Sequence, residues 1–343
     1  MKPYTFLKKN ILTIIFSLFL VGLVSFLNTN LQATQSGILL WTKNVVPSLF
    51  PFFIATELLN YTNLPYYLGK LTNKFMKPLF NVPGEASYAF IMGIISGYPV
   101  GAKIVSKFLD DGICTKKEAE RMLAFTNNSG PLFIIGTVGI SFFGYSQIGI
   151  ILFITHIISC ITVGILFGYF SATNSSEYTK SNKNNLLSLK SYNVSDLGNI
   201  LSNSIINAIS TTLLIGGFIV LFSLIISILN SLNIINYISI LSYKIGLNGE
   251  YVKGVFIGLF ELTNGISTIS SIHTKAISVQ IILTAFLLGF AGLSIFLQVF
   301  SIASKNKLSM KPYLIGKLLQ ACFAALYTFI LLKWFNILNL DIL

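Results

Sequence analysis

Polar residues that could do chemistry stand inside long apolar stretches of this sequence. One such cluster holds a carboxylate and two neutral oxygen donors, Glu261, Thr263 and Asn264, within the apolar stretch 251–272. An ionisable residue at membrane depth is costly and is therefore a functional candidate. Glu261 could carry a coupling proton, bind a cation or pair with Lys103. Its structural alternative is a hydrogen bond that closes a hairpin.

Two further clusters combine polar side chains with helix-breaking residues. They lie in the stretches 86–109 and 121–143 and contain Ser96, Gly97, Tyr98, Pro99, Gly101 and Lys103, and then Asn127, Asn128, Ser129 and Gly130. A broken helix presents unpaired N–H groups at its N-terminus, which attract anions. Lys103 could add a positive charge or be an ordinary loop lysine, and the asparagines could bind a ligand or cap a broken helix. Close packing through GxxxG spacing explains the glycines but leaves Pro99 and the asparagine pair unexplained.

The composition places these clusters in a membrane. Hydrophobic residues make up 54% of the 343 and charged residues only 10%, whereas a soluble domain has about 25% charged residues. This excludes an ordinary soluble enzyme as well as a disordered chain. Three scattered cysteines and two histidines exclude a disulfide framework and leave little scope for a metal site. The net charge of +12 lies in short clusters between apolar runs, which is typical of membrane loops and not of nucleic-acid binding.

The elements that must position the clusters are helices of membrane length, each about 20 residues. We expect about nine embedded segments, namely 11–27, 44–61, 86–109, 121–143, 147–170, 203–229, 251–272, 276–302 and 312–335. The first is expected to be an uncleaved helix and not a signal peptide. The stretch 231–243 is too short to span and is expected to lie along the interface. The clusters at 97–101, 127–130 and 261–265 favour broken or re-entrant segments.

An internal repeat divides the chain. Gly84-Glu85 returns as Gly249-Glu250, 165 residues later, and a similar offset relates the ends of the two halves. We expect four parts: an N-terminal transmembrane helix and loop over 1–36, repeat 1 over 37–170, a polar cytoplasmic linker over 171–198 and repeat 2 over 199–343.

The basic residues predict that the two halves have opposite orientations. If 86–109 and 251–272 are re-entrant hairpins, the cytoplasmic side holds every lysine and arginine except Lys43, Lys244, Lys253, Lys275 and Lys333. This distribution obeys the positive-inside rule. Inverted repeats with broken helices that meet near the midplane are a transporter architecture. The predicted fold is therefore an all-α polytopic membrane protein with an inverted repeat, two re-entrant helical hairpins and broken transmembrane helices.

Two motifs of the first half identify a family resemblance. Gly97-Tyr-Pro-Val-Gly-Ala-Lys103 and the run from Thr115 to Pro131 resemble the sporulation integral membrane protein family called YlbJ or SpoVV, within the group that carries the nucleoside-recognition "gate" domain. The architecture also resembles that of concentrative nucleoside transporters. The resemblance covers about residues 44–335, and the second-half motif, Glu261 to Gly265, supports it less strongly.

The resemblance implies transport of dipicolinic acid across the outer forespore membrane during sporulation. The expected solute is a small anionic aromatic molecule, and the residues of the three clusters are the expected substrate-binding residues. No cofactor, metal or nucleic acid is expected, a coupling proton or sodium ion could take part, and assembly of several copies is left open. The alternatives are a carrier of nucleosides or related solutes and a membrane factor for spore cortex assembly that moves no solute. An enzyme is not expected, because no nucleophile and base pair is visible.

Overall fold

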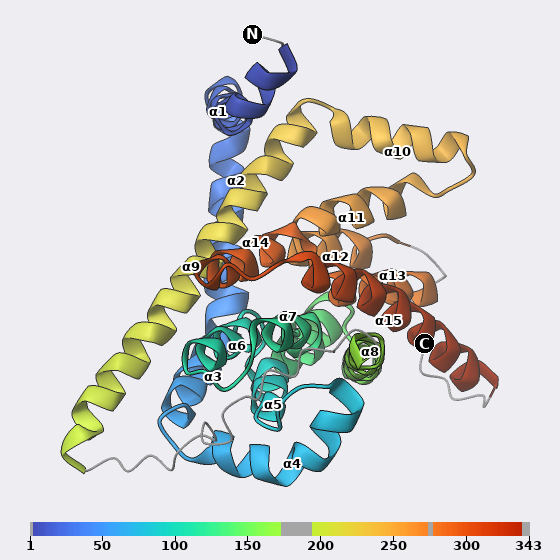
Figure 1. Cartoon of the computed structure of the whole chain (residues 1–343). Helices are drawn as coiled ribbons and strands as arrows, with labels where there is room; N and C mark the ends of the chain where they lie inside the picture. Colours follow the sequence, from blue (N-terminus) through green and yellow to red (C-terminus); the bar gives the residue numbers. More distant parts are fainter. Residues whose placement is uncertain (1–2, 173–193, 274–276, 338–343) are drawn as a thin grey trace.

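A computed structural model describes residues 3–172, 194–273 and 277–337 of the chain, and all regular structure within these ranges is helical (Figure 1). The expected all-α fold is confirmed. The helices of the first part are α1 (Pro3–Ser25), α2 (Leu27–Leu40), a π-helical segment η1 (Trp41–Val45), α3 (Val46–Leu59), α4 (Leu64–Phe80), α5 (Ala86–Ser96), α6 (Val100–Asp110), α7 (Lys116–Thr126), a second π-helical segment η2 (Leu132–Phe142) and α8 (Ser146–Ala172).

The rest of the chain continues with a similar order of elements. It contains a 3-10 turn η3 (Val194–Asp196), α9 (Leu197–Ser231), α10 (Ile234–Lys244), α11 (Gly249–Phe260), α12 (Leu262–Ser270), α13 (Ile277–Phe290), α14 (Gly292–Ala303), a 3-10 turn η4 (Ser304–Asn306) and α15 (Lys311–Ile337). The expected linker 171–198 lies mostly outside the described residues, as does Lys275.

The two halves run in opposite directions in the picture. The segment α2, η1 and α3 descends from the top of Figure 1 to α4 at the bottom, whereas α9 rises from the bottom to α10 at the top. After α4 and after α10 the order is the same: a short helical pair, a broken helix and a long helix. The inverted repeat itself stays a prediction.

Three expected breaks are present, and local chemistry explains each one. Gly97 has a φ of +79°, where a side chain would be strained, and Pro99 precedes the first residue of α6. The residues from Asn127 to Gly130 are not helical, and η2 begins after Pro131. Glu261 adopts an extended conformation between α11 and α12. The stretches 86–109 and 251–272 are therefore helical pairs and not simple spans.

A fourth break was not predicted. The expected span 276–302 divides into α13 and α14 at Ala291 and Gly292, both in the left-handed region with φ of +74° and +80°. A methyl group added at Gly292 would stand 2.9 Å from the Gly258 carbonyl oxygen, so the break lies against the second helical pair. One glycine inside an apolar run is a weak signal for a break, because isolated glycines also occur in intact helices.

Long apolar helices confirm membrane spans within the described residues. Four are long and apolar enough to cross a bilayer: Ser146–Phe170, Leu197–Ser231, Ile277–Asn306 and Lys311–Trp334. They match the expected segments 147–170, 203–229, 276–302 and 312–335. A fifth candidate is a pair of helices, Asn10–Ser25 and Leu27–Val45, bent by 101°.

The expected loop before residue 37 is wrong, because residues 27–40 form α2. Their polar composition suggested a loop, but tertiary contacts hold them in a helix. The buried Asn30 side chain donates from Nδ2 to the carbonyl oxygens of Gly22 and Leu23, at 3.1 and 3.2 Å. Gly37 packs closely against Ser223 of α9. Burial against α9 thus outweighs the weak helix propensity of these residues.

Small residues bring the first helical pair against the end of α7. A methyl group added at Gly93 of α5 or at Gly101 of α6 would stand 1.9 or 2.2 Å from the Thr126 carbonyl oxygen. Both glycines are therefore in backbone contact with Thr126, as expected for GxxxG packing. This contact places the Gly97–Pro99 break beside the Asn127–Gly130 break.

Candidate solute-binding site

Three of the four breaks, together with helix α14 that follows the fourth, supply the wall of one small cavity of about 60 Å³. The sequence-predicted residues that line it are Gly97, Tyr98, Ser129, Gly130, Glu261 and Thr263. Apolar side chains complete most of the wall, among them Leu49 of α3, Phe133 of η2 and Ile215 of α9. Residues 165 positions apart in the sequence therefore meet at one site, and both halves of the chain supply its wall.

Glu261 caps the N-terminus of α12 from inside the cavity wall. Its side chain is 3% exposed, and its carboxylate accepts hydrogen bonds from the backbone N–H groups of Thr263, at 3.2 Å, and Asn264, at 2.7 Å. A carboxylate at this position is stabilised by the helix dipole. The structural hydrogen bond considered in the sequence analysis is therefore present. The residue also lines the cavity, so a functional role is compatible with the cap.

Two polar residues of α14 were missed. Ser294 and Gln298 line the cavity and are each 1% exposed. The Gln298 amide nitrogen is 3.5 Å from the Ser294 hydroxyl, while the amide oxygen has no hydrogen-bond partner. A buried acceptor without a partner is unfavourable and suits a donor supplied by a ligand or water. Their spacing of four residues, which places both on one helix face, is the signal that could have found them.

Lys317 was also missed, because it was counted with the cytoplasmic loop lysines. It lies on α15, is 1% exposed and is one of the largest fully buried side chains among the described residues. Its ammonium donates to the Asn127 carbonyl oxygen at 2.5 Å and to Gln320 Oε1 at 2.7 Å. The expectation of a solvent-exposed lysine is wrong, because the carbonyl exposed by the α7 break supplies the oxygen that the ammonium needs.

The asparagine pair bonds to α15 and not to the cavity. Asn127 donates from Nδ2 to the Tyr313 hydroxyl at 3.1 Å, and Asn128 donates to the Phe125 carbonyl oxygen at 2.7 Å. Asn128 Oδ1 accepts from Gln320 Nε2 at 3.1 Å. Both asparagines are fully buried, and neither lines the cavity. Their hydrogen bonds connect the non-helical segment after α7 to α15. This agrees with the alternative that the asparagines cap a broken helix.

His156 joins α8 to the same break. The Ser129 backbone N–H donates to His156 Nε2 at 3.2 Å, and Nδ1 has no hydrogen-bond partner. The side chain is 1% exposed. The bond connects α8 to the non-helical segment that follows α7.

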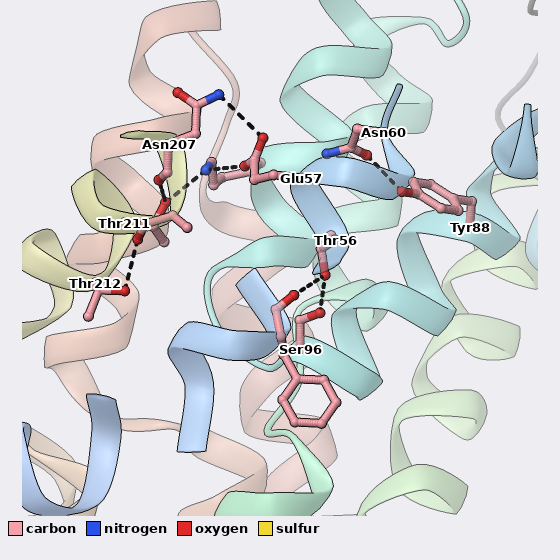
Figure 2. Close-up of polar contacts among 11 residues, drawn as sticks. Thr56, Glu57, Asn60, Tyr88, Ser96, Asn207, Thr211 and Thr212 are labelled. Carbon is pink, nitrogen blue, oxygen red and sulfur yellow. Dashed lines mark hydrogen bonds and ion pairs between the residues drawn. The ribbon is translucent and has the colours of Figure 1, made fainter. Parts of the chain in front are cut away.

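Lys103 pairs with Glu57 and not with Glu261. The Lys103 ammonium is 2.7 Å from Glu57 Oε1 and 2.8 Å from the Thr211 hydroxyl. Figure 2 shows Glu57 of α3 directed toward Asn207 of α9, whose amide donates to Glu57 Oε2 at 3.3 Å. Helices α3, α6 and α9 meet here in a shared polar cluster, to which α3 contributes Glu57, α6 contributes Lys103 and α9 contributes Asn207 and Thr211.

The remaining predicted residues lie near the cavity without lining it. Ser96 shares a short hydrogen bond with Thr56, also drawn in Figure 2. Pro99 is buried at the start of α6, and Gly101 contacts the Thr126 carbonyl. Asn264 lines a different cavity, between α2, α9 and α12, of about 480 Å³. Lys103 lines a third, of about 240 Å³, beside Glu57 and Lys107.

The site has the chemistry of solute recognition. Within the described ranges, no group of three or more histidine, cysteine or acidic side chains could hold a metal ion. Three of the half-helices, α6, η2 and α14, have no side-chain hydrogen bond at their N-terminal caps. Their N–H groups and the polar side chains can bind a ligand through hydrogen bonds and charge.

Comparison with known proteins agrees with this architecture. The family model described as nucleoside recognition, called Gate, matches residues 42–175. The sporulation integral membrane protein YlbJ of Bacillus subtilis is 32% identical over 333 residues, which cover 93% of this chain and 81% of that protein. An uncharacterised protein of Alkalihalophilus pseudofirmus is 29% identical over 126 residues, which cover 36% of this chain and 27% of that protein. No solved structure matches.

The match to the Bacillus protein extends over nearly the whole chain, including both helical pairs and the cavity residues. Together with the apolar spans, it shows that this is an integral membrane protein. The chain belongs to the YlbJ family of sporulation integral membrane proteins.

Proposed function

We propose that the protein is a carrier, and not an enzyme, that moves a small anionic aromatic solute across the membrane by alternating access. One observation carries the proposal: broken helices from both halves of the chain line the same cavity, with a buried acid in its wall. Broken helices that meet at such a site are a feature of secondary transporters. We retain the division into repeats 37–170 and 199–343 as part of this proposal.

Dipicolinic acid is the proposed solute during sporulation, at the outer forespore membrane. It is a flat aromatic ring with two carboxylates. The uncapped N-termini of α6, η2 and α14 offer N–H donors for the carboxylates, and Tyr98 and Phe133 offer ring surfaces. The apolar wall suits the ring itself.

The small volume of the cavity supports the view that this is a closed state of the carrier, which must open before the solute can bind. About 60 Å³ holds a few water molecules, at roughly 10–15 Å³ each, and is too small for a ring with two carboxylates. Binding therefore requires movement of a helical pair. The α5–α6 pair is the candidate for this movement, because the break between its helices carries Gly97 and Tyr98 into the cavity.

Glu261 is the proposed site of the coupling ion. A carboxylate has the wrong charge for a carboxylate solute, but it can take up a proton or bind sodium. Such uptake would reduce repulsion between Glu261 and the solute. Coupled movement of solute and cation follows from this arrangement.

The test is uptake of radiolabelled dipicolinate, with uridine alongside, into liposomes that hold the purified protein. Saturable dipicolinate uptake under a proton or sodium gradient is expected, and it should fall at least tenfold in Glu261→Gln. Glu250→Gln is the matched control, because Glu250 belongs to the same helical pair but is exposed. Wild-type flux in Glu261→Gln would remove that residue from the mechanism.

A nucleoside carrier is the second candidate, favoured by the match to the nucleoside recognition family over 42–175. Uridine uptake without dipicolinate uptake would support it and replace the proposed solute. Absence of flux for both solutes, from folded protein under several ion gradients, would favour a factor for cortex assembly that moves no solute.

A further inference from the structure

Lys317 is a buried cation that is not matched by an acid. Its ammonium donates to three oxygens: the Asn127 carbonyl at 2.5 Å, Gln320 Oε1 at 2.7 Å and Asn128 Oδ1 at 3.5 Å. A lysine ammonium has three donors and no acceptor, so this set of partners suits the charged form. Each of these partners is a neutral amide or carbonyl oxygen. The surroundings solvate the charge without neutralising it.

Two aromatic rings place this charge beside the cavity. The ammonium lies 5.4 Å from the ring centre of Tyr98 and 5.9 Å from that of Tyr313. Tyr98 lines the cavity, and so do Ser129 and Gly130, which directly follow the asparagines that hold Lys317. The lysine therefore stands one side chain behind the cavity wall. Cation–π contact with Tyr98 fixes its distance from any ligand there.

We propose that Lys317 sets the charge selectivity of the cavity, so that the site prefers carboxylate solutes to neutral ones of the same shape. The proposal rests on the proposed function, and it narrows the solute class to anions. A charge without an opposite partner in a low-dielectric interior is stabilised when an opposite charge binds nearby. Lys317 acts through Tyr98 and the α7 break, so it is a positioning residue and not a direct ligand.

The expected size of the effect follows from the distance. With the ring of Tyr98 between them, the ammonium and a bound carboxylate would be on the order of 8 Å apart. At an effective dielectric constant of about 20, the attraction corresponds to roughly thirtyfold in affinity for each carboxylate charge. Partial rearrangement and water would lower this figure, so we expect a preference of at least about tenfold.

A second buried charge, Glu261, opposes an anionic solute unless its carboxylate takes up the coupling cation proposed above. Glu261 also lines the cavity, but two backbone N–H groups already bond to its carboxylate. Glu57 is matched by Lys103 outside the cavity. Lys317 thus remains the cation closest to the cavity whose described partners include no carboxylate. The carboxylate of a bound solute would neutralise the charge of Lys317.

The test is equilibrium binding to detergent-purified protein, with dipicolinate and its neutral diamide, pyridine-2,6-dicarboxamide, as probes. We expect wild type to bind dipicolinate at least tenfold more tightly than the diamide. In Lys317→Gln, dipicolinate affinity should fall about tenfold to thirtyfold, and diamide affinity should stay within about twofold. Lys333→Met is the matched control, since Lys333 lies on the same helix but is exposed; it should keep the wild-type ratio.

A purely structural role gives a different result. Affinity for both probes would then fall together in Lys317→Gln, and this outcome would overturn the proposal. If Lys317→Gln is not monodisperse, the same two affinities are measured for Lys317→Met. The ratio of dipicolinate to diamide affinity in the wild type is a second test. Equal wild-type affinity for the two probes would also overturn the proposal. Because binding is measured apart from flux, a protein that binds dipicolinate selectively but moves no solute would refute the carrier and leave the role of Lys317 intact.

Discussion

Replacement of Gly93 by alanine should disrupt the packing that holds the first helical pair against α7. The added methyl carbon would stand 1.9 Å from the Thr126 carbonyl oxygen and 3.1 Å from its carbon. Ordinary van der Waals contact begins at 3.4 Å, so α5 and α7 would have to separate by about 1.5 Å. The obstacle is backbone on both sides, and it cannot be relieved by a change of rotamer.

The expected cost is at the upper end of the range for overpacked cores, about 3 kcal/mol. A domain of about 150–250 residues shifts by roughly 2–4 °C for each kcal/mol, so the melting temperature of this longer chain should fall by up to about 6–12 °C. The separation would also move the Gly97–Pro99 break away from Asn127–Gly130, because Gly101 contacts the same carbonyl. Solute binding should therefore weaken in the fraction that remains folded.

The assay is thermal unfolding of the purified protein in one detergent, followed by tryptophan fluorescence and by loss of monodisperse protein. Gly217→Ala is the matched control, because it also lies within a helix and an added methyl group meets nothing within 4 Å. That variant should match wild type or exceed it slightly, since alanine favours the helix by up to about 1 kcal/mol. Equal melting temperatures for the two variants would show that the reasoning about Thr126 is wrong.

Three more predictions concern other parts of the chain. A double-mutant cycle with Glu57→Gln and Lys103→Gln should give a coupling of about 1 kcal/mol in thermal stability; strictly additive effects would contradict the shared cluster of Figure 2. Burial, with nearby Glu118 and Glu85, raises the pKa of Cys114 to about 12, so this thiol stays protonated from pH 7 to 9; N-ethylmaleimide should spare Cys114 in the folded protein and label it after denaturation, as checked by peptide mass spectrometry. A reporter inserted at Gly112, in the turn between α6 and α7, should give a cytoplasmic signal, and an external signal would exclude the re-entrant hairpin.

Local chemistry made much of the fold predictable. The breaks at Gly97–Pro99, Asn127–Gly130 and Glu261 were expected, because glycine, proline and polar residues are poorly suited to an apolar helix. A further local signal is the capping box of α7, in which Thr115 and Glu118 exchange hydrogen bonds at the first turn. Long apolar runs likewise gave the four spans.

The features that could not be predicted depend on contacts between residues that are far apart in the sequence. Lys317 looked like a loop residue, and the Asn127 carbonyl that binds it lies 190 residues away. Its spacing of three residues from Gln320 places two polar groups on one helix face, which is the signal that could have revealed it. The partners of Glu57 could not be predicted from the sequence either, since Lys103 and Asn207 approach it only in the folded chain.

The bond between Lys317 and the α7 break has a consequence for biosynthesis. The Asn127 carbonyl and the Asn128 amide oxygen enter the membrane early, but their partners on α15 are made about 190 residues later. During that interval the centre of the first half contains polar groups without their final partners. The last long helix therefore completes the interior of the first half, and a ribosome-bound chain that stops before α15 should be recognised by quality-control proteases as unfinished.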